Sequence, residues 1–305
     1  MAWSDPDLAK GAVDWQTGRV AIRFVQPVTS LELPELAPYR TLRQHEEHRR
    51  EGIFVAEGEK VVRRLLESDL TVLSTLLPEK WFRELEPVLR MRAEPIAVYT
   101  APKPVLETLT GFTMYQGVLA VGRCRPAWSL EEAVERTTTP RLLAAVDGLS
   151  SAENLGALVR NCAAFRVQAL LVGETSSSPW LRRAVRAGMG TIFQLPTVEP
   201  PDLAHALYQL REAGVRCVAA HPHVRGRTLA QAEFTGDCCV VFGSEGHGLA
   251  PWVLKACDEA VALPMPPEID SLNVASAAAV FLYEANRQRG WDHSPAFTAR
   301  SSPSR

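Results

Sequence analysis

The stretch Leu263-Pro-Met-Pro-Pro-Glu-Ile-Asp-Ser-Leu-Asn-Val-Ala-Ser276 decides the fold class of this chain. An apolar run precedes it, and a run of helix-forming residues follows it. A second stretch of the same kind, Phe242-Gly-Ser-Glu-Gly-His-Gly-Leu249, comes about twenty residues earlier. In each, an expected strand runs into a loop of small and polar residues. Because such strand ends face the ligand crevice of an open parallel sheet, the two loops predict a ligand site.

Nearly continuous apolar runs precede and follow these loops, as is typical of parallel strands that are covered on both faces. The runs are residues 142–146, 169–172, 191–195, 215–220, 238–242 and 260–263. Helical patterns lie between them, such as 202–213, which is followed by Gly214 at a helix-ending position. Alternating strands and helices predict an α/β domain with a doubly wound parallel sheet over residues 141–290.

A smaller α/β unit is expected over residues 39–125, where helical and strand patterns also alternate. The expected helices are 40–50, 58–67, 79–91 and 102–109, and the expected strands are 53–56, 70–77, 96–99 and 116–121. Residues 1–38 form an extension of uncertain order with one expected strand at 20–25, and residues 126–140 form a linker with one short helix. The polar, proline-bearing tail 291–305 is expected to be disordered.

Three polar constellations together resemble the motifs of the SpoU/TrmH family of RNA ribose 2′-O-methyltransferases. They are the two stretches quoted above and Asn154-Leu-Gly-Ala-Leu-Val-Arg160, and the resemblance extends over the whole second domain. In the first domain, Phe54-Val-Ala-Glu-Gly58 and Tyr115-Gln-Gly-Val-Leu-Ala120 resemble the substrate-binding domain of many family members. That domain is related to RNA-binding ribosomal proteins.

The resemblance implies a fold and a reaction. The fold would be a small ribosomal-protein-like α/β RNA-binding domain followed by a methyltransferase domain with a C-terminal trefoil knot. The reaction would be methyl transfer from S-adenosylmethionine to a ribose 2′-hydroxyl in structured RNA, with ribosomal RNA as the first choice. Two alternatives stay open: the same chemistry on transfer RNA, and a non-catalytic RNA-binding or ribosome-assembly factor that retains the fold. The resemblance also implies a homodimer in which Arg160 completes the pocket of the partner.

The residues that the resemblance assigns to the site have chemistry of their own. Gly243 allows a close backbone approach, the Glu245 carboxylate can orient a cation, and Ser271 or Asn273 can cap the last helix. A guanidinium stays charged in proteins, so we expect Arg160 to be a cation that stabilises the developing alkoxide rather than the general base of some family accounts. The catalytic assignments are Arg160, Asn154, Glu245, Ser271 and Asn273, and the cofactor-binding assignments are Gly243, Leu263, Met265 and Leu272. Taken singly, each residue could equally be a helix cap or half of a surface ion pair.

Three positions depart from the family pattern. Ser150-Ser151 stands where the first motif often has Asp-Pro, Pro267 stands where the third motif usually has glycine, and Ala275-Ser276 replaces the usual Ser-Val. The polar residues of the family pattern are all present, which indicates an active enzyme.

The overall charge is not that of a typical nucleic-acid-binding protein. The 305 residues include 46% hydrophobic and 22% charged residues, with a formal net charge of −2. Contacts with RNA phosphates must therefore come from local clusters. The first cluster is Arg40, Arg43, Arg49 and Arg50, and Arg63, Arg64, Arg182, Arg183 and Arg186 are further candidates. Glutamates dilute the first cluster, so a solvated helix face is an equal alternative.

Other classes of protein fit the sequence poorly. The six cysteines lack CxxC spacing and the His221-Pro-His223 pair lacks further ligands, so we expect no metal site and no disulfides. The loop after residue 242 matches neither GxGxxG, nor a P-loop, nor the GxSxG of hydrolases. No secretory signal or membrane span is visible, and a reduced, cytoplasmic protein is expected.

Overall fold

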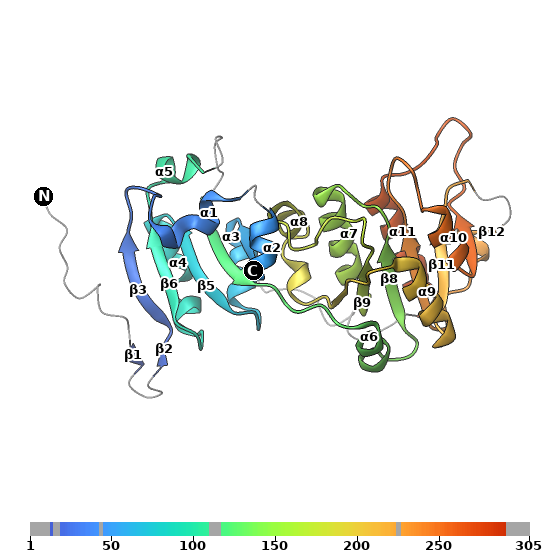
Figure 1. Ribbon diagram of the computed structural model, residues 1–305, viewed down its shortest axis with the longest axis horizontal. Coiled ribbons are helices and arrows are strands. Elements are labelled where there is room, and N and C mark those ends of the chain that lie inside the picture. Colours follow the sequence, from blue (N-terminus) through green and yellow to red (C-terminus); the bar gives the residue numbers. More distant parts are fainter. Residues whose placement is uncertain (1–12, 15–18, 43–44, 110–116, 224–226, 291–305) are drawn as a thin grey trace, which may run out of the picture. The chain divides into compact units, whose positions relative to one another are not determined.

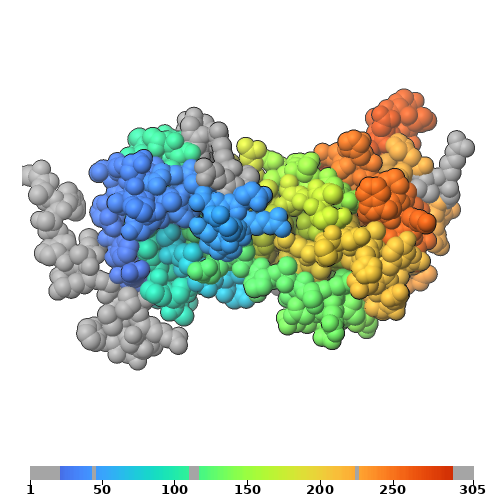
Figure 2. Space-filling view, in the orientation of Figure 1, coloured from blue at the N-terminus to red at the C-terminus, as the bar shows by residue number. Residues whose placement is uncertain are grey.

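The computed structural model describes residues 13–14, 19–42, 45–109, 117–223 and 227–290. The chain forms two compact units, each built around its own sheet (Figure 1). The first comprises residues 1–125 and the segment 180–193, and the second comprises residues 126–179 and 194–305. The space-filling view uses the same colours, with the part of the chain before residue 125 in blue to green and the part after it in green to red (Figure 2).

The first unit contains a five-stranded mixed sheet with the order β3-β6-β5-β7-β4. Its strands are β3 Ile22–Pro27, β4 Ile53–Glu57, β5 Val72–Leu77, β6 Ile96–Thr100 and β7 Leu119–Arg123. The pairs β3–β6 and β6–β5 are parallel, and β7 is antiparallel to both β5 and β4. A short antiparallel pair, β1 Val13–Asp14 and β2 Arg19–Val20, precedes this sheet.

Amphipathic helices supply the hydrophobic core of the first unit. They are η2 Pro34–Leu36, α1 Ala37–Arg40, α2 His45–Glu51, α3 Glu59–Leu66, α4 Glu79–Arg90 and α5 Lys103–Glu107. In α3, Val61, Val62, Leu65 and Leu66 are buried on one side, which confirms the expected amphipathic pattern. Leu36 and Tyr39 pack into a core that includes residues from four of the strands.

The strand expected near residues 20–25 is an integral part of this unit and not a loose extension. β3 pairs with β6 over residues 22–27, and Val28, Leu31 and Leu36 after it are buried. The compact unit therefore begins well before Tyr39.

The segment 180–193 interrupts the sequence of the second unit and packs within the first unit. The ring of Phe54 lies 5.0 Å from that of Trp180 and 5.3 Å from that of Phe193, measured between centroids. The segment contains α8 Arg182–Ala187 and the 3-10 turn η3 Thr191–Phe193. The range expected from the sequence for the second domain, 141–290, thus includes the residues 180–193, which pack in the first unit.

The second unit contains a seven-stranded sheet with the order β10-β9-β8-β13-β11-β14-β12, and all of its pairs are parallel. The strands are β8 Leu142–Val146, β9 Ala169–Val172, β10 Thr197–Val198, β11 Arg216–Ala220, β12 Arg227–Thr228, β13 Cys238–Phe242 and β14 Glu259–Ala262. The central strands β8, β9 and β13 are buried along their whole length. The predicted mixed α/β class with a parallel sheet is confirmed.

One predicted strand is wrong. Residues 191–195 contain η3 rather than a strand, and the edge strand β10 follows at Thr197–Val198. Ile192 and Phe193 are apolar because they are buried in the first unit. Burial without periodicity does not distinguish a strand from another buried segment.

The helices of the second unit begin and end at the expected kinds of residue. They are α6 Leu130–Arg136, α7 Ala152–Ala164, α9 Leu203–Glu212, the 3-10 turn η4 Leu229–Gln231, α10 Pro251–Ala256 and α11 Val274–Gln288. Asp202 caps α9 by accepting from the His205 amide, and Gly214 after its end has a φ of +82°. α7 and α11 pack together, since Asn161 donates to the Ala275 carbonyl at 2.6 Å and Asn286 to the Phe165 carbonyl at 2.7 Å.

Two further properties concern only the part of the chain that the structure describes. Its helices include none with the length and apolar character that a membrane span requires. Cys217, Cys238 and Cys239 are free and buried, as expected for cysteines that pack as small hydrophobes.

Candidate active site

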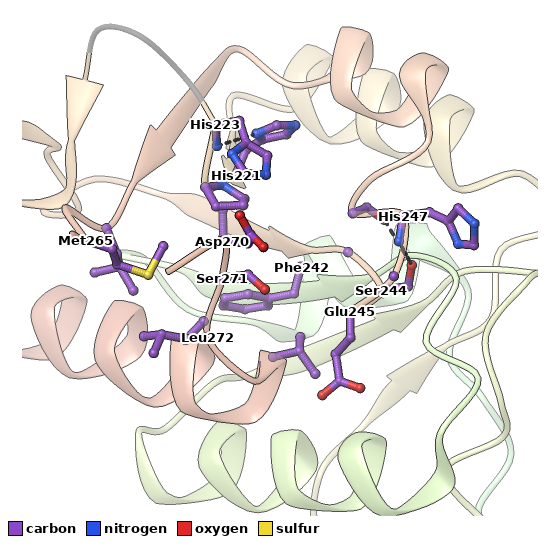
Figure 3. Close-up of a pocket in the computed structure, with 18 of the residues that line it drawn as sticks. His221, His223, Phe242, Ser244, Glu245, His247, Met265, Asp270, Ser271 and Leu272 are labelled. Carbon is purple, nitrogen blue, oxygen red and sulfur yellow. Dashed lines mark hydrogen bonds between the residues drawn. The ribbon is translucent and has the colours of Figure 1, made fainter. Parts of the chain in front are cut away.

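A pocket opens at the carboxyl ends of the adjacent strands β13, β11 and β14, and its volume is about 510 Å³ (Figure 3). Loops after all three strands contribute to it, together with the first two turns of α11. It is lined by Ala220, His221, Pro222, His223, Phe242, Gly243, Ser244, Glu245, Gly246, His247, Gly248, Leu263, Met265, Asp270, Ser271, Leu272, Val274, Ala277 and Phe281. This is the crevice that the parallel-sheet pattern predicts.

All four residues that were assigned to cofactor binding line this pocket, namely Gly243, Leu263, Met265 and Leu272. In the close-up, Phe242, Ser271 and Leu272 lie between Met265 on one side and Glu245 on the other (Figure 3). Phe242, Asp270 and Phe281 also line the pocket, although the sequence alone did not assign them to it. The two phenylalanines, whose ring centroids lie 6.0 Å apart, resemble ordinary core residues in the sequence, because only the fold brings them to one cavity.

The loop after β13 is closed by its own backbone. The Ser244 amide donates to the Gly248 carbonyl at 3.0 Å, and the Gly248 amide donates to the Ser244 carbonyl at 2.9 Å. A Cβ atom on Gly243 would lie 2.2 Å from the Gly248 carbonyl carbon and 2.4 Å from the Leu249 nitrogen. Gly243 is therefore required by the close approach of the chain to itself.

Gly243→Ala should consequently lower both stability and ligand affinity, whereas Gly246→Ala in the same loop should do neither. A side chain forced into packed backbone costs about 1–3 kcal/mol in the free energy of unfolding. A Cβ on Gly246 would meet nothing within 4 Å, which makes it a matched control. Denaturant unfolding and calorimetry with S-adenosylmethionine would measure the two effects. Equal behaviour of the two variants would contradict this explanation of Gly243.

Asn273 joins two of the predicted catalytic residues. Its side-chain nitrogen donates to Glu245 Oε1 at 2.6 Å and to Asn154 Oδ1 at 3.1 Å. Its side-chain oxygen accepts from the amides of Ala275 and Ser276, so Asn273 also caps α11. The prediction that Ser271 or Asn273 caps this helix is confirmed for Asn273. The side chains of Asn154, Glu245 and Asn273 thus form one connected polar cluster at the edge of the pocket.

Arg160 does not join this cluster. Asn154 lies in the first turn of α7, after the Ser151 cap, and Arg160 lies on the exposed surface of the same helix. Six residues along an α-helix turn the side-chain direction by about 240°. Among the described residues that line the pocket, Arg160 does not occur. Within one chain, the structure places the predicted central cation outside the cavity.

Two positions that depart from the family pattern have local explanations. Pro267 lies in a turn that the Ile269 amide closes by donating to the Pro266 carbonyl at 3.0 Å, and proline suits such a turn. Ser151 caps α7, since its hydroxyl accepts from the Asn154 amide at 3.2 Å. Both substitutions therefore preserve the loop and the helix start.

His221 and His223 bring imidazole groups to the pocket. The His223 amide donates to Nδ1 of His221 at 3.2 Å, and the two rings meet edge to face. Burial, and in second place the proximity of His223, lowers the pKa of His221 below its usual value. An uncharged imidazole therefore faces the cavity at neutral pH. The described residues contain no group of three or more His, Cys, Asp or Glu side chains that could hold a metal ion.

The arginines that were predicted to contact RNA have different surroundings. Arg40 donates to the carbonyls of Leu31 and Leu33, so its guanidinium holds the turn before α1. Arg43 lies outside the described residues. Arg49 and Arg50 are exposed in the last turn of α2.

The alternative candidates also have structural partners, and two of them share one. Arg182 and Arg186 of α8 both form ion pairs with the buried carboxylate of Glu57, at 2.7 Å in the case of Arg186. Both ion pairs lie within the first unit and hold the segment 180–193 there.

Known proteins are similar to this chain in both sequence and fold. Residues 141–283 match the SpoU rRNA methylase family. An uncharacterized tRNA/rRNA methyltransferase of Mycobacterium bovis is 33% identical over 86% of this chain and 92% of its own length. A 23S rRNA (guanosine-2′-O-)-methyltransferase, RlmB of Yersinia pestis, is 31% identical over 68% of this chain and 85% of its own.

A solved structure agrees with these matches. The SpoU methyltransferase AviRb from Streptomyces viridochromogenes, in complex with the cofactor AdoMet, superposes with a TM-score of 0.72 at 25% identity. The superposition covers 83% of this chain and 96% of that one. The parallel sheet, the pocket at its carboxyl edge and these relatives lead to one conclusion: the chain belongs to the SpoU family of RNA methyltransferases.

Proposed function

We propose that this protein transfers the methyl group of S-adenosylmethionine to a ribose 2′-hydroxyl in structured RNA, and that the RNA is ribosomal. The observation that carries the proposal is the polar cluster of Asn154, Glu245 and Asn273 beside a pocket lined by all four expected cofactor residues. The similarity to a 23S rRNA (guanosine-2′-O-)-methyltransferase supports the choice of RNA and of the ribose oxygen.

The pocket has the size and lining that the cofactor requires. Ligand pockets of about 300–1,000 Å³ are usual for molecules of this size, and this one is about 510 Å³. Phe242, Phe281 and Leu272 offer apolar surface to a flat ring, whereas His221 and Asp270 offer polar groups. Bound here, S-adenosylmethionine would supply an activated methyl group on its sulfonium centre. Glu245 would present a carboxylate whose orientation the Asn273 amide fixes.

Arg160 supplies the positive charge that the attacking ribose oxygen needs. A guanidinium keeps its proton above pH 12, so it acts as a cation and leaves the hydroxyl proton to a phosphate oxygen or water. Because Arg160 lies outside the pocket of its own chain, we infer that it acts at the pocket of a second copy. The reaction centre would then contain residues of both subunits.

The exposed surface of α11 supports a homodimer. Val280 and Tyr283 on α11 are 41% and 54% exposed, although both are large and apolar. The Tyr283 ring contacts the Phe165 ring at the end of α7, with a centroid distance of 6.4 Å. Exposed apolar side chains on α11 mark an interaction surface, and Arg160 lies on α7, which packs against α11.

We also propose that the C-terminal segment is knotted and that the first unit binds RNA. After β14, the chain must pass β11 and β13 to bring α11 against α7, which follows β8. This return brings the segment after β14 beside the loops that follow β11 and β13, an arrangement that a trefoil knot requires. The first unit has its own sheet and core and resembles a substrate-binding domain.

Incubation of the protein with ribosomal RNA, transfer RNA and methyl-labelled S-adenosylmethionine tests the reaction. A 2′-O-methyl group blocks alkaline cleavage of the adjacent phosphodiester, so label should remain in alkali-resistant dinucleotides from ribosomal RNA. Label in base-methylated nucleosides would contradict ribose methylation. Label in transfer RNA alone would favour the alternative substrate, and RNA binding without cofactor binding would favour a non-catalytic factor.

The exposed arginines of α2 give a separate prediction about RNA affinity. Arg49→Ala with Arg50→Ala should weaken RNA binding and flatten its dependence on salt, because each phosphate contact contributes about 0.9 to the slope on duplex RNA. Cofactor affinity should not change. A double variant of Arg83 and Arg90, which are exposed on α4, is the control. If both double variants bind RNA alike, the α2 arginines form only a solvated face.

A further inference from the structure

The first unit contains a second groove, of about 730 Å³, on one face of its sheet. Each of the five strands contributes residues to it, as does the segment that contains η2 and the start of α1. It is lined by Arg23, Phe24, Gln26, Leu33, Glu35, Pro38, Glu51, Ile53, Leu73, Ser74, Ala97, Tyr99, Val121 and Arg123. The groove belongs wholly to the first unit.

The register of the sheet explains the floor of the groove. Phe24 pairs with Ala97, Ala97 with Ser74, and Ser74 with Val121, so these side chains form a row across one face. Phe24, Leu33, Leu73 and Ala97 pack on the core below but are only partly buried. Phe24 and Tyr99 meet edge to face, with ring centroids 5.6 Å apart. The floor is therefore an apolar surface with an accessible aromatic ring.

The rim of the groove carries charges of both signs. Arg23 lies with its guanidinium carbon 5.9 Å from the Phe24 ring centroid, and Arg123 is exposed at the end of β7. Within the described part of the chain, neither these arginines nor Glu35 and Glu51 form an ion pair with another residue. By contrast, Arg92 and Arg125 of the same unit pair with Glu94 and Asp69.

Charged groups of the rim act on the buried part of the groove. The pKa of Tyr99 is raised, first by burial and next by the negative charge of Glu35, while Arg23 acts in the opposite direction. Tyr99, Glu35 and Arg23 all line this groove. A ligand that fits here needs a flat apolar face, hydrogen-bond donors along one edge and negative charge at its ends.

We infer that this groove holds one unpaired nucleotide of the RNA substrate, with its base against Phe24 and its flanking phosphates beside Arg23 and Arg123. Proteins recognise single-stranded RNA by stacking bases on aromatic rings and by hydrogen bonds to their Watson–Crick edges. Carboxylates only accept hydrogen bonds, and guanine offers two adjacent donors, so Glu35 or Glu51 favours guanine over uracil. The inference rests on the proposed action on RNA and adds a recognition site in the first unit to the methyl-transfer pocket of the second.

Fluorescence anisotropy with the full-length protein tests the groove without any cofactor. The probes are a labelled uridine oligonucleotide with one central guanosine and the same oligonucleotide without guanosine. The first should bind more tightly. Arg23→Ala and Arg123→Ala should weaken both, each lowering the salt slope by about 0.7 for a single strand. Arg83→Ala on α4, exposed but outside the groove, is the matched control and should bind like the wild type.

Two further variants separate base recognition from general attraction. Glu35→Gln and Glu51→Gln together should remove the preference for guanosine and leave the affinity for oligouridine unchanged. Phe24→Leu retains apolar volume without an aromatic face and should lower affinity at least about fivefold, because one base stacked on an aromatic ring contributes that much. Thermal unfolding checks that each variant is folded. If Phe24→Leu does not fold, the variants of the exposed Arg23 and Arg123 test the groove in its place.

The outcomes distinguish the groove from the proposed reaction. If groove variants bind both probes like Arg83→Ala, the inference is wrong even where the enzyme methylates RNA. If the groove variants behave as expected but no methyl transfer occurs with any RNA, the groove stands and the proposed reaction fails. Wild-type protein that binds neither probe would overturn the inference, and the groove would then be a site for another class of ligand.

Discussion

Arg160→Ala is expected to reduce methyl transfer at least about a hundredfold while cofactor affinity stays within about twofold of the wild type. The reason is that a cation beside the attacking oxygen stabilises the transition state and makes no contact with the cofactor in the ground state. Removal of one such electrostatic group costs about 10²–10³ in rate. Single-turnover methylation and calorimetry with S-adenosylmethionine would measure the two quantities separately.

Two control variants sharpen this test. Arg136→Ala removes an exposed arginine of α6, which pairs with Glu132 outside the pocket, and should leave the rate unchanged. Arg160→Lys retains the charge without the planar fork and should recover only part of the rate. If Arg160→Ala methylates RNA within a few-fold of the wild type, the assignment of Arg160 is wrong.

The sequence predicts the second sheet well because its strands are buried on both faces. A strand such as β13, Cys238–Phe242, must be apolar along its length, and the loop that follows it must contain small and polar residues. The resemblance to the family assigned Gly243, Leu263, Met265 and Leu272 to the cofactor, and all four line the pocket at this edge of the sheet. Parallel strands bring their carboxyl ends to one edge whatever the order of the strands.

The predictions fail where a segment packs far from its sequence neighbours. In the turn Thr191–Phe193, the apolar residue Phe193 packs against the Phe54 ring. Phe54 precedes it by more than a hundred residues, so the local sequence does not reveal this partner. Phe242 and Phe281 reach the pocket from a strand and from a helix, and nothing in their local sequence separates them from other core residues. Both errors have one cause: an apolar side chain indicates burial but does not show which residues it packs against.

Arg160 marks a different limit. Its distance of six residues from Asn154 already places the two side chains on different faces of α7, and the structure confirms that only Asn154 meets Asn273. When a residue acts at the pocket of a second chain, the sequence pattern of one chain does not show which pocket its side chain enters. The resemblance to the family supplied the expectation, and the exposure of Arg160 gives it a physical basis.

Mixing two inactive variants is expected to restore activity if the site is shared between subunits. Arg160→Ala lacks the cation but keeps an intact pocket, whereas Asn273→Ala keeps the cation but loses the group that joins Glu245 to Asn154. A mixed dimer contains one pocket with both features. Random exchange in a two-fold dimer makes half of the dimers mixed, each with one competent site, so about a quarter of wild-type activity should return.

The magnitude of this recovery separates the two arrangements of the site. If Arg160 acts at the pocket of its own chain, every chain in the mixture lacks one essential group and no activity returns. The reference is the double variant Arg160→Ala with Asn273→Ala, mixed with wild-type protein. If the site is shared, the mixed dimers of this reference contain no site with both groups. Subunit exchange must be verified first by mixing differently tagged chains and recovering both on one tag. Exchange without recovered methyl transfer would contradict the shared site, since Asn273→Ala removes a helix cap worth about 1 kcal/mol and is not expected to unfold the subunit.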